Sequence, residues 1–215
     1  MKKLCLVILL FNFYQSASAQ FDLRVSMGID FVNTPSLVDY INNYYLSGSD
    51  LLGDFNSAVN FSGETDYFFS ENFHIGIEIA YLLNSFTQTY PEGQYELNYG
   101  IIMPSVLAYY VFSGEGYNFK FGGGVGIRFV NADESLPATG TTISYSSTGP
   151  GFILRALGNT ALSENLYATI GADLRYDLNG EPMNGDKPLG NSEQIPATDF
   201  NSLSAGVKLG VTFTF

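Results

Sequence analysis

Apolar and polar side chains alternate along five segments that are spread over the chain. From Phe21 to Phe31 every second residue is apolar, and the residues between them are small, polar or charged. A period of two is typical of a β-strand with one apolar and one polar face. The five segments are Phe21–Val32, Phe73–Leu83, Phe119–Phe129, Leu166–Leu178 and Leu203–Phe215. We therefore expect five strands of this kind.

Weaker patterns predict three further strands, at about residues 57–69, 95–111 and 143–159. Pro104 and Pro150 lie inside two of them and predict bends or bulges, because proline has no N–H group to give to the ladder. The pattern does not assign the facing of these three strands, least of all over Ile101–Val106.

The predicted connections alternate in length. Three are tight, at residues 70–72, 113–117 and 161–165, and four are longer, at residues 33–56, 87–94, 131–142 and 179–198. Short turns on one side and long loops on the other are the plan of an outer-membrane barrel with periplasmic turns and extracellular loops. We expect an all-β fold, an eight-stranded antiparallel up-and-down transmembrane barrel.

The charged residues indicate which strand face points inward. Beyond residue 19, six of the seven basic residues lie on polar strand faces, and so do seven acidic ones: Asp22, Asp30, Glu64, Asp66, Glu78, Asp173 and Asp177. A soluble sandwich places its apolar face inside and its charges outside. Since buried charges need partners, we predict an ion-paired, plugged lumen. The predicted network is Arg24, Glu64, Glu78, Lys120, Arg128, Arg155, Asp173, Arg175 and Lys208.

The first residues have the three parts of a secretory signal peptide. Lys2 and Lys3 precede the apolar block Leu4–Phe13, and Ala17-Ser18-Ala19 offers small residues for cleavage before Gln20. We expect residues 1–19 to be removed, leaving residues 20–215 as one barrel domain without cysteine. An N-terminal membrane anchor is the alternative.

The amino-acid composition excludes two further classes of protein. The formal net charge of -12 argues against nucleic-acid binding, and 46% hydrophobic with 14% charged residues argues against disorder.

The end of the chain is similar to one family in particular. Phe215 is the last residue, and apolar residues alternate before it at Val207, Leu209, Val211 and Phe213. The chain thus resembles the small eight-stranded outer-membrane β-barrels, such as the membrane domain of OmpA, and OmpX. The resemblance implies insertion into outer-membrane lipid of a double-membraned bacterium, with the terminal strand read by the barrel assembly machinery. Because the chain has no Trp, we expect its aromatic girdle to consist of Tyr and Phe: Phe31, Tyr81, Tyr109, Phe119, Phe129, Tyr176 and Phe213.

The first long connection contains a helix signal. Thr34 and Pro35 suit the N-cap and first turn, and the apolar residues that follow, from Leu37 to Tyr45, predict an amphipathic helix of about ten residues. The helix either packs on the barrel rim or acts as a plug or lid.

Little in the sequence indicates catalysis, a metal or a cofactor, and we expect none. His74 is the only histidine, and we expect it to be a rim residue that hydrogen-bonds within the lumen. The acids of the last loop, Glu181, Asp186, Glu193 and Asp199, lack a calcium-loop spacing. Gly122-Gly123-Gly124 and Gly126 lie inside a strand, where they leave room for bulky lumen neighbours rather than form a phosphate loop.

Two functional hypotheses remain. The first is a non-enzymatic barrel with a plugged lumen that acts in envelope structure or surface interaction through its loops. The second is a narrow channel or carrier for small hydrophobic molecules, resembling OmpW and gated by the helix at residues 34–45. A continuous series of ion pairs favours the first, and a lumen that is apolar toward its extracellular end favours the second.

Overall fold

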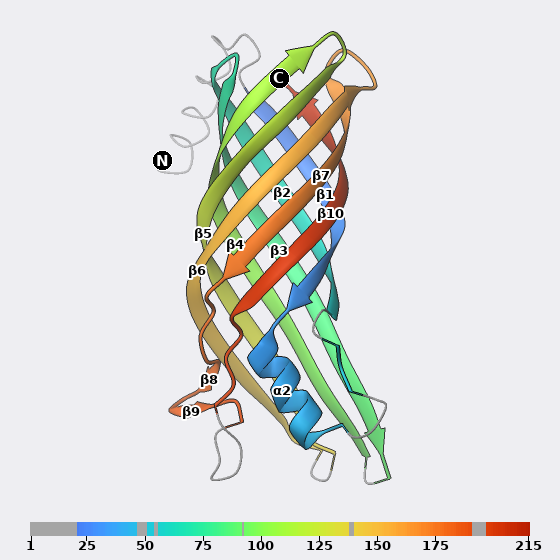
Figure 1. Cartoon of the computed structure of the whole chain (residues 1–215), viewed down its shortest axis with the longest axis vertical. Coiled ribbons are helices and arrows are strands. Elements are labelled where there is room, and N and C mark those ends of the chain that lie inside the picture. Colours follow the sequence, from blue (N-terminus) through green and yellow to red (C-terminus); the bar gives the residue numbers. More distant parts are fainter. Residues whose placement is uncertain (1–20, 47–50, 54–55, 92, 138–139, 191–196) are drawn as a thin grey trace, which may run out of the picture.

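Eight antiparallel strands close into a barrel in the computed structural model of the chain (Figure 1). The structure describes residues 21–46, 51–53, 56–91, 93–137, 140–190 and 197–215, so the predicted signal peptide and its cleavage before Gln20 lie outside it. The ring consists of β1 (Phe21–Asn33), β2 (Asn56–Ser70), β3 (Phe73–Tyr90), β4 (Gly93–Gly114), β5 (Tyr117–Ser135), β6 (Thr142–Ala161), β7 (Leu166–Asp177) and β10 (Ser202–Thr214). β1 pairs with β10 and closes the ring, which confirms the predicted eight-stranded barrel.

The two ends of the barrel differ. The three predicted tight turns lie together at the end that also holds the C-terminus, which we call the short-turn end. The opposite end carries the helix α2 (Pro35–Tyr44) and a small hairpin of β8 (Met183–Asn184) and β9 (Lys187–Pro188), as Figure 1 shows. Among the described residues, no helix has the length and apolar character that a membrane crossing requires.

The apolar strand faces point outward, as predicted. In β1, Leu23 and Val25 are 48% and 55% exposed, whereas Asp22 and Arg24, which alternate with them, are 3% and 2% exposed. An apolar belt faces outward around the ring, an arrangement that suits a barrel in lipid. The interior contains charged and polar side chains, together with apolar ones that come above all from β4. One girdle residue was predicted wrongly, because Tyr109 points inward and is fully buried.

One predicted loop is a hairpin instead. Residues 87–94 were expected to form a long connection, but β3 and β4 stay paired as far as Tyr90 and Gly93. The pairing continues because the inward row of this extension, Tyr95 and Leu97, is buried against α2 and its surroundings, which compensates for the ordering of the extra residues.

The prolines do not shift the strand register. The pairing of β4 with β5 has the same register on both sides of Pro104, and Pro150 lies opposite Ile127 without a shift. Proline here removes a hydrogen bond without inserting an extra residue, so the predicted bulges were wrong. The register shift that the structure does contain lies between Phe68 and Ser70, beside a short turn.

The end of the barrel away from the short turns has an apolar core of its own. We call α2, the distal parts of β3 to β6 and residues 178–190 and 197–201 the outer lobe. Leu37, Tyr40 and Ile41 of α2 pack in one buried cluster with strand residues and with Leu189 and Phe200 of the last connection. The predicted helix is confirmed, although the Thr34 side chain makes no capping hydrogen bond. A buried helix face therefore closes the open side of the extended strands.

Candidate functional site in the barrel lumen

A buried ammonium bridges two carboxylates near the short-turn end of the lumen. Lys120 Nζ lies 2.6 Å from Asp22 Oδ2 and 2.6 Å from Asp66 Oδ2. Arg24 Nη2 extends the group, at 3.4 Å from Asp66 Oδ2 and 2.5 Å from Glu64 Oε1. Alternation on β1, β2 and β5 places all five side chains on inward faces, where each is at least nine-tenths buried.

Arg155 is the hub of the lumen centre. It lies 2.5 Å from Glu64 Oε2 and 2.7 Å from Glu78 Oε2 through Nη1, and 2.7 Å from Asp173 Oδ1 through Nε. Arg175 and Lys208 each lie 2.8 Å from Asp173 Oδ2. A continuous series of ion pairs thus runs from Asp22 at the mouth to Lys208 at mid-barrel.

Three of these contacts join strands that face each other across the ring. In the strand order of the barrel, β1 lies opposite β5, β2 opposite β6, and β3 opposite β7. Lys120 reaches from β5 to Asp22 on β1, and Arg155 reaches from β6 to Glu64 on β2. Arg175 on β7 lies 3.3 Å from Glu78 on β3. The ion pairs therefore span the lumen as well as lining it.

Arg128 lies apart from this series. Its Nε is 2.5 Å from Asp177 Oδ1, and its Nη1 donates to Ser105 Oγ at 3.1 Å. Of the nine residues predicted as a network, eight are linked by ion pairs and Arg128 forms a separate pair with Asp177. Gly151 makes the room for that pair, because a Cβ at this position would collide with Arg128 Nε and Asp177 Oδ1.

The sequence did not predict that Tyr109 lies in the lumen and contacts the charged side chains there. Its hydroxyl donates to Glu64 Oε1 at 2.6 Å, and Gly122 on β5 leaves space for its ring. Inward positions of β4 around Tyr109 are apolar or aromatic without charge, so no pattern marked the inward face. The glycines of the neighbouring strand β5, which leave room for a bulky inward side chain, were the available sequence signal.

A buried carboxylate holds α2 on the outer lobe. Glu134 Oε1 accepts hydrogen bonds from Tyr40 at 2.6 Å, from Tyr95 at 2.9 Å and from Tyr45 at 3.5 Å. Burial, with the nearby Glu134 charge, raises the pKa of the Tyr45 phenol to about 12. Glu134 was missed because residues 131–142 were expected to be a loop, whereas β5 continues to Ser135.

A cavity of about 180 Å³ lies between α2 and the barrel wall. Leu37, Val38 and Ile41 line one side, and Leu97 and Tyr99 of β4 lie on the other. Polar side chains also line the cavity, from Thr34, Asn56, Ser57, Asn84 and Ser85, so its lining is mixed.

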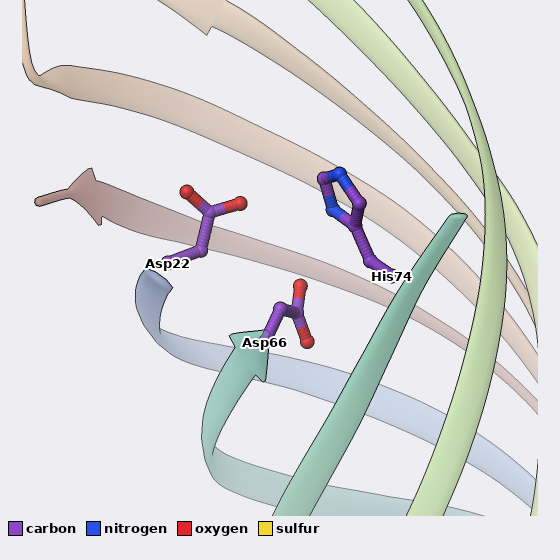
Figure 2. Close-up of side chains that lie close together, drawn as sticks. All are labelled: Asp22, Asp66 and His74. Carbon is purple, nitrogen blue, oxygen red and sulfur yellow. The ribbon is translucent and has the colours of Figure 1, made fainter. Parts of the chain in front are cut away.

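His74 lies beside two acidic side chains at the mouth (Figure 2). Atoms of Asp22, Asp66 and His74 that could bind a metal all lie within 4.8 Å of one another. The expected hydrogen bond of a rim histidine is missing at one nitrogen, because within the described part of the chain Nδ1 is buried without a partner. No sequence pattern marked this group, because the pairing of three strands brings its residues together.

No protein-family model matches the sequence, and no curated protein matches it as a relative. Solved structures match the whole fold. A major outer membrane protein from Thermus thermophilus is 12% identical, with a TM-score of 0.56, covering 93% of this chain and 100% of that one. Ail, the attachment invasion locus protein of Yersinia pestis, in complex with the heparin analogue sucrose octasulfate, is 13% identical, with a TM-score of 0.52 and coverage of 91% and 99%. Neisserial surface protein A is 14% identical, with a TM-score of 0.50 and coverage of 91% and 97%.

The chain has the fold of the small outer-membrane β-barrel proteins. In outer-membrane barrels the short turns face the periplasm and the longer connections face outward. The sequence predicts the same orientation for this chain, and by that prediction we call the short-turn opening, where the ion pairs of Lys120 lie, the periplasmic mouth. The terminal residues Val207, Leu209, Val211, Phe213 and Phe215 are exposed on the outer side of the barrel wall. Their recognition by the assembly machinery stays a prediction.

Proposed function

We propose that this protein is a closed, non-enzymatic barrel of the bacterial outer membrane, exported by the signal peptide at residues 1–19. It acts in envelope structure or surface interaction through its outer lobe. One observation carries the proposal, namely the ion pairs that join opposite strands across the lumen. An eight-stranded barrel is just wide enough inside for side chains to fill, so such pairs obstruct the passage of ions.

Single-channel recording in a planar bilayer tests this proposal. We expect the refolded protein to migrate as a heat-modifiable species on gels and to show no stable conductance. A variant with Arg155→Ala and Lys208→Ala, which removes two large side chains from the centre, controls for the sensitivity of the assay. Discrete conductance steps in the unmodified protein would overturn the closed-barrel proposal.

The charge of the outer lobe supports a basic or neutral surface partner. Six of the seven basic residues beyond residue 19 lie in the lumen, which leaves Lys187. Exposed acids of the lobe include Asp133, Glu181 and Asp186. A polyanion such as the heparin analogue bound to Ail would be repelled by this surface. We expect binding to a poly-lysine peptide that weakens with salt and no binding to heparin oligosaccharides; the reverse preference would contradict this assignment.

The cavity under α2 favours a second candidate function, the capture of a small hydrophobic molecule at the outer lobe. Its volume of about 180 Å³ is similar to that of engineered apolar cavities, roughly 150 Å³, which bind benzene. Its apolar wall of Leu37, Val38 and Leu97 suits such a guest.

Calorimetric titration with benzene and short alkanols tests this candidate. Val38→Phe should fill the cavity and abolish binding, whereas Val211→Phe on the outer barrel wall should leave binding unchanged. An unmodified protein that takes up none of these probes would exclude the hydrophobic-ligand function and leave the closed-barrel proposal standing.

A further inference from the structure

Three neighbouring strands bring metal-binding atoms together at the periplasmic mouth. Asp22 lies on β1 opposite Asp66 on β2, and His74 is the second residue of the neighbouring strand β3. The three side chains point toward a common space (Figure 2), and their ligand atoms lie within 4.8 Å of one another. Gly76 lies opposite Asp66, and a side chain at Gly76 would collide with Asp66 Oδ1.

Two polar atoms of this group of side chains are buried without a partner. Within the described part of the chain, His74 Nδ1 and Asp66 Oδ1 accept no hydrogen bond. His74 is 6% exposed, and its ring stacks on Phe68 with 4.1 Å between the centroids. Because buried polar atoms normally have partners, an unpaired nitrogen held in a fixed orientation beside two carboxylates points to a ligand that it can bind.

The atoms present suit a transition metal rather than calcium or magnesium. One imidazole nitrogen with two carboxylate oxygens matches divalent first-row ions, whereas Ca²⁺ and Mg²⁺ prefer oxygen alone. Ligand atoms around tetrahedral Zn²⁺ are about 3.4 Å apart, so rotations that move the side chains by about 1 Å complete the set. A cavity of about 430 Å³ lined by Asp22, His74 and Thr214 gives access from the mouth.

We propose that Asp22, Asp66 and His74 bind a divalent first-row transition ion, with Zn²⁺ as the probe. Lys120 is its built-in competitor, because the ammonium lies 2.6 Å from both carboxylates and bridges them. The ion binds when the flexible Lys120 side chain moves aside. The described lumen also contains one carboxylate more than its six cations, which favours an added cation.

Calorimetry with ZnCl₂ on untagged, refolded barrel tests the site, and the visible absorption of bound Co²⁺ reports its coordination. We expect micromolar affinity for Zn²⁺. His74→Phe keeps the ring stacked on Phe68 but removes the nitrogen, so it should weaken binding about tenfold or more and abolish the Co²⁺ spectrum. Absence of Zn²⁺ binding, or unchanged binding by His74→Phe, would overturn the proposal.

Removing the competitor gives an independent test. Lys120→Met should tighten Zn²⁺ binding about tenfold, whereas the matched variant Lys208→Met, which removes an ammonium from mid-barrel, should not change it. Equal or weaker binding by folded Lys120→Met would contradict the competition. If Lys120→Met does not form a heat-modifiable species, the proposal is tested by comparing Zn²⁺ binding of the unmodified protein with that of His74→Phe.

Discussion

Arg155 Nη1 lies 2.5 Å from Glu64 Oε2, and this contact joins two strands on opposite sides of the barrel. It also links the ion pairs of the periplasmic mouth to those of the lumen centre. A single substitution at Arg155 therefore separates the two groups of charges.

Replacing Arg155 by Met should destabilise the barrel strongly. Glu64, Glu78 and Asp173 would each lose a buried cationic partner, and breaking a buried pair from one side costs about 3–5 kcal/mol. The free energy of unfolding in urea, followed by far-UV circular dichroism because the chain has no Trp, measures the effect. A loss below about 1 kcal/mol would show that the series of ion pairs contributes little.

Lys208→Met should have a smaller effect of the same sign. Lys208 Nζ lies 2.8 Å from Asp173 Oδ2, but Asp173 keeps Arg155 and Arg175 as partners. We expect a loss of about 2 kcal/mol in the same urea experiment. Leu209→Met on the outer face of β10 is the matched control and should change stability by less than about 0.5 kcal/mol. An unchanged free energy of unfolding for Lys208→Met would contradict a stabilising ion pair between Lys208 and Asp173.

Gly151→Ala should disturb the lumen although it adds one methyl group. The new Cβ would collide with Arg128 Nε and Asp177 Oδ1 and push this ion pair apart. We expect about 1–3 kcal/mol of destabilisation, the usual cost of overpacking. Gly63→Ala, where a Cβ meets open space, is the control. If the two variants are equally stable, the ion pair of Arg128 and Asp177 does not lie against Gly151.

Glu134→Gln should loosen α2 without unfolding the barrel. The variant replaces the charged acceptor of the Tyr40 and Tyr95 hydroxyls by a neutral amide, which weakens charge-assisted hydrogen bonds. Faster proteinase K cleavage in the outer lobe, with an unchanged heat-modifiable band, is the expected result. Asp133→Asn, which affects the exposed neighbour on the other strand face, should leave the cleavage rate unchanged.

Alkaline pH should loosen the same helix. Burial raises the pKa of Tyr45 from 10.0 to about 12, so its contribution to lobe stability is fully present below about pH 10 and is lost as the pH rises toward 12. Hydrogen exchange of the α2 amides should therefore accelerate between these values beyond the ordinary base-catalysed increase. Tyr45→Phe should remove part of that acceleration. If the pH dependence of exchange is the same in this variant, groups other than Tyr45 cause the acceleration.

The sequence predicts the barrel well where charges mark one face. On β1, Asp22 and Arg24 identify the inward side, and the structure agrees. On β4 the inward row, from Tyr95 to Val111, is without charge, so alternation could not assign its direction and Tyr109 was placed outside. Alternation also could not reveal how far β3 and β4 extend, because that depends on burial against α2.

The grouping of acidic and histidine side chains at the periplasmic mouth could not be predicted from the sequence, for a different reason. Asp22, Asp66 and His74 are brought together by the register of three strands, and a shift of one residue would turn their side chains to the other face. Register follows from packing around the closed ring, which no local pattern encodes.

The burial of nearly all basic side chains makes the folded barrel unusually resistant to trypsin. Trypsin cleaves after Lys or Arg, but beyond residue 19 the six lumen cations are inaccessible in the folded state. Lys187, which is exposed, is followed by Pro188, and trypsin cleaves such bonds poorly. Survival of the intact chain in trypsin therefore reports the folding of the barrel strands, which carry all the other cleavage sites beyond residue 19, and a fragment cut at one of these sites signals a barrel that has opened.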